Sequence, residues 1–166
     1  MINGFKAFNG NMSNNYNKVF YEGKDYYVDG EIKFGLKGNG YHFAKRIEDT
    51  FRYINDKENI SIAKVYSNGE VLSFDDEYYG YYDLYVSNHI HIEKVLKRNE
   101  IISEILKNGE SALKRFIATG FKLTNEELLA LTPYINENVF KYIEFYYHGK
   151  DYNEVFSLEK KLVLKK

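Results

Sequence analysis

The chain contains no cysteine and no tryptophan, and Pro133 is its single proline. The absence of cysteine excludes disulfide bonds and thiolate metal sites, and it is typical of proteins in a reducing compartment. No stretch approaches the roughly 18 consecutive apolar residues that indicate a membrane-spanning helix. Residues 1–10 lack a basic region followed by a long apolar run, so we expect no secretory signal there. These absences predict a cytoplasmic protein with no membrane partner.

Signatures of common catalytic sites are also absent. The sequence contains no G-x-S-x-G, no H-E-x-x-H and no cysteine nucleophile. The glycine-rich stretch at residues 35–40 lacks the G-K-[ST] ending of a phosphate-binding loop. The sequence therefore predicts no cofactor and favours a non-catalytic protein.

The formal charge of −1 disfavours direct binding to nucleic acid, because neutralising phosphates requires a clustered basic surface. The charge is unevenly divided. Residues 1–93 carry 10 Lys/Arg and 14 Asp/Glu, whereas residues 94–166 carry 13 and 10. This change predicts two parts, a β-rich domain over residues 1–93 and a helical subdomain over residues 94–166.

The first part shows the short alternating segments and turn residues of β structure. We expect strands at 5–8, 60–66, 70–74 and 84–92, and a hairpin that joins 19–21 to 26–28. Residues 45–54 place Ile47, Phe51 and Ile54 on one helical face. The predicted fold is α+β, a twisted antiparallel sheet with one packed helix, followed by a small helical subdomain.

The second part has the periodicity and the end signals of short helices. We expect helices over 95–106 and 111–119, and a third that begins with the capping box Thr124–Glu127 and stops before Pro133. Asn136 is then expected to cap a further helix with Val139, Tyr142, Ile143 and Tyr146 inward. Residues 151–154 are expected to start one more turn, and residues 158–164 fit either a strand or a helix.

The most unusual segment combines four acids and four tyrosines in nine residues: Asp75, Asp76, Glu77, Tyr78, Tyr79, Tyr81, Tyr82 and Asp83, with Gly80 among them. Such a segment does not fit a buried strand. As a loop it would present a negative, aromatic surface that mimics nucleic acid, with carboxylates in place of phosphates and rings in place of bases. An acidic hairpin tip that serves solubility is the alternative. The 17 tyrosines of the chain also fit the codon usage of an AT-rich genome.

Three histidines are candidates for chemistry. If Tyr41 and Phe43 face the core, His42 faces the other side of its strand, where it can bind a ligand or act as a base. A hydrogen-bonded structural histidine is the alternative. His89 and His91 share one face of a strand that Glu93 continues, which gives a weak metal candidate, H-x-H-x-E. The alternative there is the solvated face that any half-buried strand requires.

The order of these segments resembles an uncharacterised domain family common in phage and prophage proteins. The resemblance covers residues 5–95 and is carried by Lys6-Ala7-Phe8, Tyr21-Glu22-Gly23-Lys24-x-Tyr26, Gly30-Glu31-Ile32-Lys33, Gly40-Tyr41-His42-Phe43, Glu48-Asp49-x-Phe51-x-Tyr53 and Ala63-Lys64-Val65. Members often carry cysteines near the G-[FY]-H-F segment, where this chain has Ala44. The resemblance implies a mobile-element setting and brings no established activity.

The aromatic strand before a helix is also similar, at the level of fold, to ADP-ribosyltransferases. That likeness implies that His42 and Tyr53 contact NAD and that Glu70 or Glu93 is the catalytic carboxylate.

Together these observations favour a non-catalytic protein-binding protein of phage or prophage origin. Its expected partner is a host protein or ribonucleoprotein in the host cytoplasm, specifically a nucleic-acid-handling defence effector that it inhibits, as an anti-CRISPR protein does. The expected contact surface is the segment 75–83. The alternatives are an NAD-dependent ADP-ribosyltransferase-like enzyme and a virion or structural accessory protein. The sequence leaves the oligomeric state open.

Overall fold

The computed structural model describes residues 1–35, 37–54, 59–119, 121 and 123–146. The elements expected at 151–154 and 158–164 lie outside these residues. The chain divides into two compact units, Met1–Glu104 and Ile105–Lys166. The last strand ends at Val95, close to the change of composition at residue 94, and the boundary between the units falls within α1 (Arg98–Lys107).

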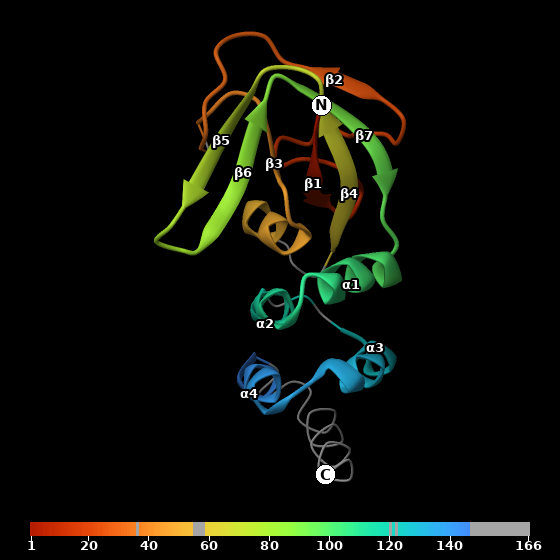
Figure 1. The fold of residues 1–166 in the computed structure, drawn as a ribbon. Helices are drawn as coiled ribbons and strands as arrows, with labels where there is room; N and C mark the ends of the chain where they lie inside the picture. Colours follow the sequence, from red (N-terminus) through yellow and green to blue (C-terminus); the bar gives the residue numbers. More distant parts are fainter. Residues whose placement is uncertain (36, 55–58, 120, 122, 147–166) are drawn as a thin grey trace. The chain divides into compact units, whose positions relative to one another are not determined.

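The first unit contains one seven-stranded antiparallel sheet, which confirms the predicted α+β class (Figure 1). The strands follow one another in the order β2-β7-β4-β1-β3-β6-β5 across the sheet. Their bounds are β1 Ile2–Asn9, β2 Asp25–Tyr27, β3 Tyr41–Ala44, β4 Ile60–Ser67, β5 Val71–Asp76, β6 Tyr81–Ser87 and β7 His89–Val95. The hairpin expected between 19–21 and 26–28 is wrong, because β2 pairs with β7 instead.

Four of these strands form one long hairpin that bends in its middle. β4 pairs with β7 before the bend and β5 pairs with β6 beyond it (Figure 1). At the bend, the hydroxyl groups of Ser67 and Ser87 lie 2.6 Å apart, and the Ser87 hydroxyl donates to the Glu70 carbonyl at 2.7 Å. Both serines are buried. These hydrogen bonds replace the ladder bonds that the bend interrupts.

The bend corrects the expectation of a single strand over 84–92. Tyr85 and Ile90 pack in the same hydrophobic cluster, although their positions differ by an odd number. A straight strand would place them on opposite faces. The bend at Asn88 therefore brings Tyr85 of β6 and Ile90 of β7 to one cluster, while Leu84 and Val86 are buried on the other face of β6.

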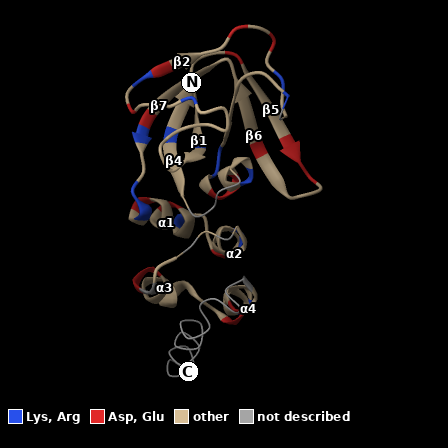
Figure 2. Ribbon diagram, turned by 180° about the vertical axis from the view of Figure 1, so that it is seen from behind, with Lys and Arg blue, Asp and Glu red and all other residues tan. Residues whose placement is uncertain are grey.

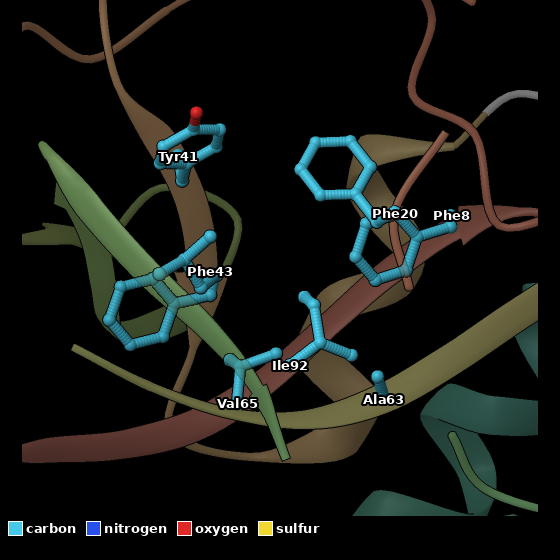
Figure 3. Close-up of a cluster of buried hydrophobic side chains, with 8 residues drawn as sticks. Phe8, Phe20, Tyr41, Phe43, Ala63, Val65 and Ile92 are labelled. Atoms are coloured by element: carbon cyan, nitrogen blue, oxygen red, sulfur yellow. The ribbon is translucent and has the colours of Figure 1, made fainter. Parts of the chain in front are cut away.

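The main core lies on one face of the sheet, where strands distant in sequence meet (Figure 3). It is built from Phe8, Phe20, Tyr41, Phe43, Ala63, Val65, Ile90 and Ile92. The Phe8 and Phe20 rings are 5.1 Å apart, and the Phe20 ring meets the Tyr26 ring at 4.7 Å. The loop between β1 and β2 thus supplies Phe20 to cover the sheet.

The short helix η1 (Ile47–Tyr53) packs against β1 and β3. Ile47, Phe51 and Ile54 are all buried, as the sequence pattern predicts. The same helix buries Asp49, whose carboxylate lies 3.0 Å from the Arg46 guanidinium. The element is a 3-10 helix, in which side chains three residues apart lie one above the other, so Arg46 and Asp49 are placed to meet.

The second unit contains α2 (Glu110–Ala118), α3 (Asn125–Leu131), η2 (Thr132–Tyr134) and α4 (Glu137–Tyr146), with α2 packed against α4. The capping box is confirmed, because the Glu127 amide donates to Thr124 Oγ1 at 3.1 Å and the Thr124 amide donates to Glu127 Oε1 at 2.9 Å. Asn136 caps α4 through the Val139 amide at 2.9 Å. Val139 and Ile143 are buried as expected, whereas the expectation for Tyr142 is wrong, because it is 40% exposed; the side chain of Tyr146 lies outside the described part.

Candidate binding surface at the β5–β6 hairpin

The backbone at the end of the β5–β6 hairpin is fixed by its own acidic side chains. Asp75 Oδ1 accepts the Asp83 amide at 2.9 Å, and Asp76 Oδ1 accepts the Tyr79 amide at 3.4 Å. Gly80 has a φ of 71°, in the left-handed region that glycine adopts without strain, and its amide closes the turn on the Glu77 carbonyl at 3.2 Å. Aspartates therefore hold this turn, as short polar side chains commonly do.

Two of the four acids of the segment also meet cations. Asp76 lies 3.2 Å from the Arg52 guanidinium of η1, and Asp83 lies 3.6 Å from Lys45 Nζ. Figure 2 shows the acidic residues at the end of β5. The hairpin end is consequently less negative than its composition indicates. Among the residues that the structure describes, no cation meets the exposed acids Asp75 and Glu77.

Most of the tyrosine rings at this hairpin face solvent. Tyr78 is 89% exposed, Tyr79 is 68% exposed and Tyr82 is 45% exposed. The Tyr78 and Tyr79 rings pack edge to face with centroids 4.8 Å apart. We call these three residues the tyrosine tip. Tyr81 points the other way, where the Arg52 guanidinium stacks 4.6 Å from its ring.

An aromatic cluster continues from the hairpin onto β3 and η1. The Phe34 ring lies 5.0 Å from the Phe74 ring and 5.8 Å from the His42 ring. The His42 ring also lies 5.8 Å from the Tyr53 ring. Burial raises the pKa of Tyr53 to about 12, so its hydroxyl stays protonated at neutral pH. Arg52 joins this cluster to the hairpin, because it contacts both Tyr53 and Tyr81.

His42 lies on the face of β3 opposite to Tyr41 and Phe43, as the alternation predicts, but its ring is held by the main chain. The Gly35 amide donates to Nε2 at 3.1 Å, and a further backbone hydrogen bond involves Gly40. Burial, with a smaller contribution from the charge of Lys6, lowers the pKa of His42 to about 4. The geometry is that of a neutral, hydrogen-bonded histidine.

This pKa predicts a pH dependence of stability. Between about pH 4 and 6.5 the unfolded chain binds the imidazole proton and the folded chain does not, so acidification favours unfolding. We expect His42 to cost on the order of 1–2 kcal/mol of stability by pH 4.5, allowing for its partial exposure. Urea unfolding at pH 7 and pH 4.5 measures this, with His42→Gln as the comparison, because Gln keeps an acceptor for Gly35. An equal loss of stability in both proteins would contradict the prediction.

The structure brings together only part of the set implied by the likeness to ADP-ribosyltransferases. His42 and Tyr53 are neighbours. Glu70 lies at the bend of the long hairpin, where its amide donates to Asn88 Oδ1 at 3.0 Å. Glu93 is exposed on β7, away from β3 in the sheet order.

His89 and His91 do share one face, and the carboxylate that meets them is Asp25 of β2. Asp25 Oδ1 lies 2.8 Å from His89 Nε2 and 3.1 Å from His91 Nδ1. The hydrogen bond from His89 is the main cause that lowers the pKa of Asp25. His89 Nδ1 accepts the Asn68 amide at 3.0 Å, so His89 ties β2 to the bend.

Glu93 does not join this group. The register between β4 and β7 skips Glu93, so the alternation that would align it with the histidines ends at His91. Within the described residues, no three or more His, Asp or Glu side chains are arranged to hold a metal ion.

Several residues of this surface carry no signal in the sequence alone. Arg52, Lys45, Phe34 and Phe74 belong to no candidate site in the sequence, because their contacts in this surface are with residues distant along the chain. Asp25 likewise meets His89 from 64 residues away. The spacing of Arg46 and Arg52 around the apolar face of η1 is the only local hint, since both fall outside the buried positions.

Comparisons with protein-family models, with curated proteins and with solved structures find no match. In the part of the chain that the structure describes, no helix combines the length and the apolar character needed to cross a lipid bilayer.

Proposed function

We propose that this chain is a non-catalytic protein-binding protein and that the tyrosine tip is its main contact surface. The observation that carries the proposal is the exposure of Tyr78, Tyr79 and Tyr82 on a hairpin whose turn is fixed by hydrogen bonds. Tyrosine supplies a large contact area with few rotatable bonds, and it is enriched among the residues that dominate binding energy.

The support of the tip favours binding over a role in solubility alone. The aspartates, Arg52 and Lys45 already hold the hairpin in the free protein. Binding to a prearranged surface avoids the entropic cost of ordering a loop. A hairpin that served only solubility would need exposed charge, whereas here two of the four carboxylates are neutralised by cations.

The narrower proposal is that the partner is a host nucleic-acid-handling defence effector that a phage or prophage protein inhibits. The support is the combination of exposed rings with the carboxylates of Asp75 and Glu77 on one hairpin. Since Asp76 and Asp83 meet cations, this form of the proposal depends on the rings more than on mimicry of phosphates. Cleavage by a purified effector, measured with and without the chain, tests it, and undiminished cleavage would reject it.

The tip is tested by replacing all three rings with Ser. Truncating a central interface tyrosine costs about 2 kcal/mol or more, so we expect the triple variant Tyr78→Ser/Tyr79→Ser/Tyr82→Ser to bind its partner at least about 100-fold more weakly. Tyr81 is kept, because it stacks on Arg52 and supports the hairpin. Pull-down from host lysate with quantitative mass spectrometry identifies the proteins affected.

The matched control replaces three exposed tyrosines elsewhere, as Tyr16→Ser/Tyr21→Ser/Tyr134→Ser. These rings are 78%, 58% and 56% exposed, so the control removes a similar aromatic area. A partner retained by the control and lost by the tip variant supports the proposal. Equal retention by wild type and a folded tip variant would reject the tip as the contact surface.

A further inference from the structure

The strand β5 has an open edge. β5 is the last strand of the sheet and pairs only with β6 among the described residues. The Asn88 amide bonds to the Glu70 carbonyl, whereas Asp83 of β6 bonds through its carbonyl to Lys45 next to β3. The even-numbered residues of β6 therefore form their backbone hydrogen bonds with β5, and the odd-numbered ones form theirs with β3. Ser73 lies opposite Tyr85, an odd-numbered residue, so the amide and carbonyl of Ser73 point away from β6, toward the open edge.

Between Val71 and Phe74, this edge lacks the protection that edge strands usually carry. Sheets normally end in very short strands, lysines or prolines, which prevent pairing with other chains. The opposite edge strand, β2, has only three residues. β5 has six, and residues 70–77 contain no lysine, arginine or proline. A bulge begins only after Phe74, so Val71–Phe74 is regular.

Apolar side chains lie beside the open edge. Leu72 is 40% exposed and Phe74 is 44% exposed, and both point to the same face because they are two residues apart. Phe34 packs against Phe74 and widens this apolar strip. An added strand would place alternate side chains against it, as in other cases of recognition by strand addition.

We propose that β5 accepts an extended segment of a protein partner as an eighth strand, and that this segment carries lysine or arginine at its ends and apolar residues at alternate positions between them. The charge of the edge identifies the segment as basic. Glu70 lies at one end of the edge and Asp75 and Glu77 at the other, all exposed. The Glu70 and Glu77 carboxylates meet no cation in the described part of the chain.

The same charges disfavour a second copy of this chain. An antiparallel pair of β5 strands centred on Ser73 would set Glu70 of one copy opposite the acidic run Asp75–Glu77 of the other, at both ends, and Arg52 meets only Asp76 of that run. Like charges directly opposite each other destabilise a strand pair. A basic segment meets complementary charge at both ends instead.

The inference deepens the proposed function and rests on it, because strand addition along β5 would lead the partner to the tyrosine tip. Strand addition can nevertheless be wrong while the proposed function holds. Ser73→Pro removes the outward amide and is compatible with an edge position, whereas Ser73→Thr keeps the amide. The probe is a synthetic peptide of alternating valine and threonine with two lysines at each end, and its comparison carries glutamates instead.

Fluorescence anisotropy with full-length chain measures binding. We expect the lysine peptide to bind at least about tenfold more tightly than the glutamate peptide, with a similar loss in Ser73→Pro and none in Ser73→Thr. A retained circular dichroism spectrum verifies that each variant is folded. Equal binding of both peptides, no binding of the lysine peptide, or unchanged binding by a folded Ser73→Pro would each overturn the inference.

Two further outcomes separate this inference from the proposed function. A partner that requires the tyrosine tip but is captured equally by Ser73→Pro would overturn strand addition and leave the proposed function standing. A dimer in light scattering that Ser73→Pro abolishes would show that a second copy occupies the edge, and it would overturn the basic segment.

Discussion

Replacing Phe43 with Ala is expected to lower the free energy of unfolding of the first unit by about 3–5 kcal/mol. The Phe43 side chain is fully buried, packs against the Tyr85 ring at 5.1 Å and belongs to the main core (Figure 3). Its removal forfeits the burial of a large ring and leaves a cavity that the surrounding strands cannot easily fill. Urea unfolding followed by circular dichroism measures the change.

Phe74→Ala is the matched control, since it makes the same chemical change on an exposed ring. Phe74 is 44% exposed and contacts Phe34 at the surface, so we expect a loss of about 1 kcal/mol or less. Equal losses in the two variants would contradict the assignment of Phe43 to the core.

Replacing Arg46 with Met is expected to cost about 3 kcal/mol or more. The Asp49 side chain is fully buried and lies 3.0 Å from the Arg46 guanidinium, and Glu48, also buried, lies 3.8 Å from it. Methionine keeps much of the apolar stem but removes a guanidinium charge, itself 42% exposed, that meets two buried carboxylates. Removing one partner of a buried ion pair costs more than the pair itself contributes, because the remaining charge is desolvated.

Lys45→Met provides the comparison at the neighbouring residue. Its ion pair with Asp83 is largely exposed, so the variant should lose between zero and about 1 kcal/mol. Thermal unfolding at pH 7 resolves the difference. Equal stability of Arg46→Met and Lys45→Met would contradict the prediction that the ion pair with the buried Asp49 stabilises the fold more than the exposed pair with Asp83.

The features that the sequence predicts well are local. The Thr124–Glu127 capping box and the apolar face of Ile47, Phe51 and Ile54 each depend on residues a few positions apart. Hydrophobic period and cap chemistry are both visible at that range. The strands expected at 60–66 and 70–74 are observed as β4 and β5 for the same reason.

The features that the sequence does not predict depend on distant pairing. The local pattern of 19–28 fits a hairpin, yet Tyr26 pairs with Ile90 of β7. The pattern of 84–92 fits one strand, yet the contact between Ser67 and Ser87 bends it. Strand register and order are set by how whole faces are buried, which no short window of sequence contains.

The candidate surface likewise has some features that the local sequence predicts and others that depend on distant contacts. The exposure of most of the ring side chains at 75–83 follows from local composition, because so many acids and tyrosines cannot be buried together. The partial neutralisation of the negative charge of that segment does not follow from local composition, because Arg52 and Asp76 are 24 positions apart in the sequence. The partner acid of the histidine pair, Asp25, is distant for the same reason.

The central claim is that a partner contacts the tyrosine tip, and amide hydrogen exchange of the free and partner-bound chain tests it most directly. The account predicts that exchange slows on binding at residues 77–82, while the exposed loop at residues 14–17 is unchanged. Slower exchange at residues 14–17 or elsewhere, with residues 77–82 unaffected, would contradict it.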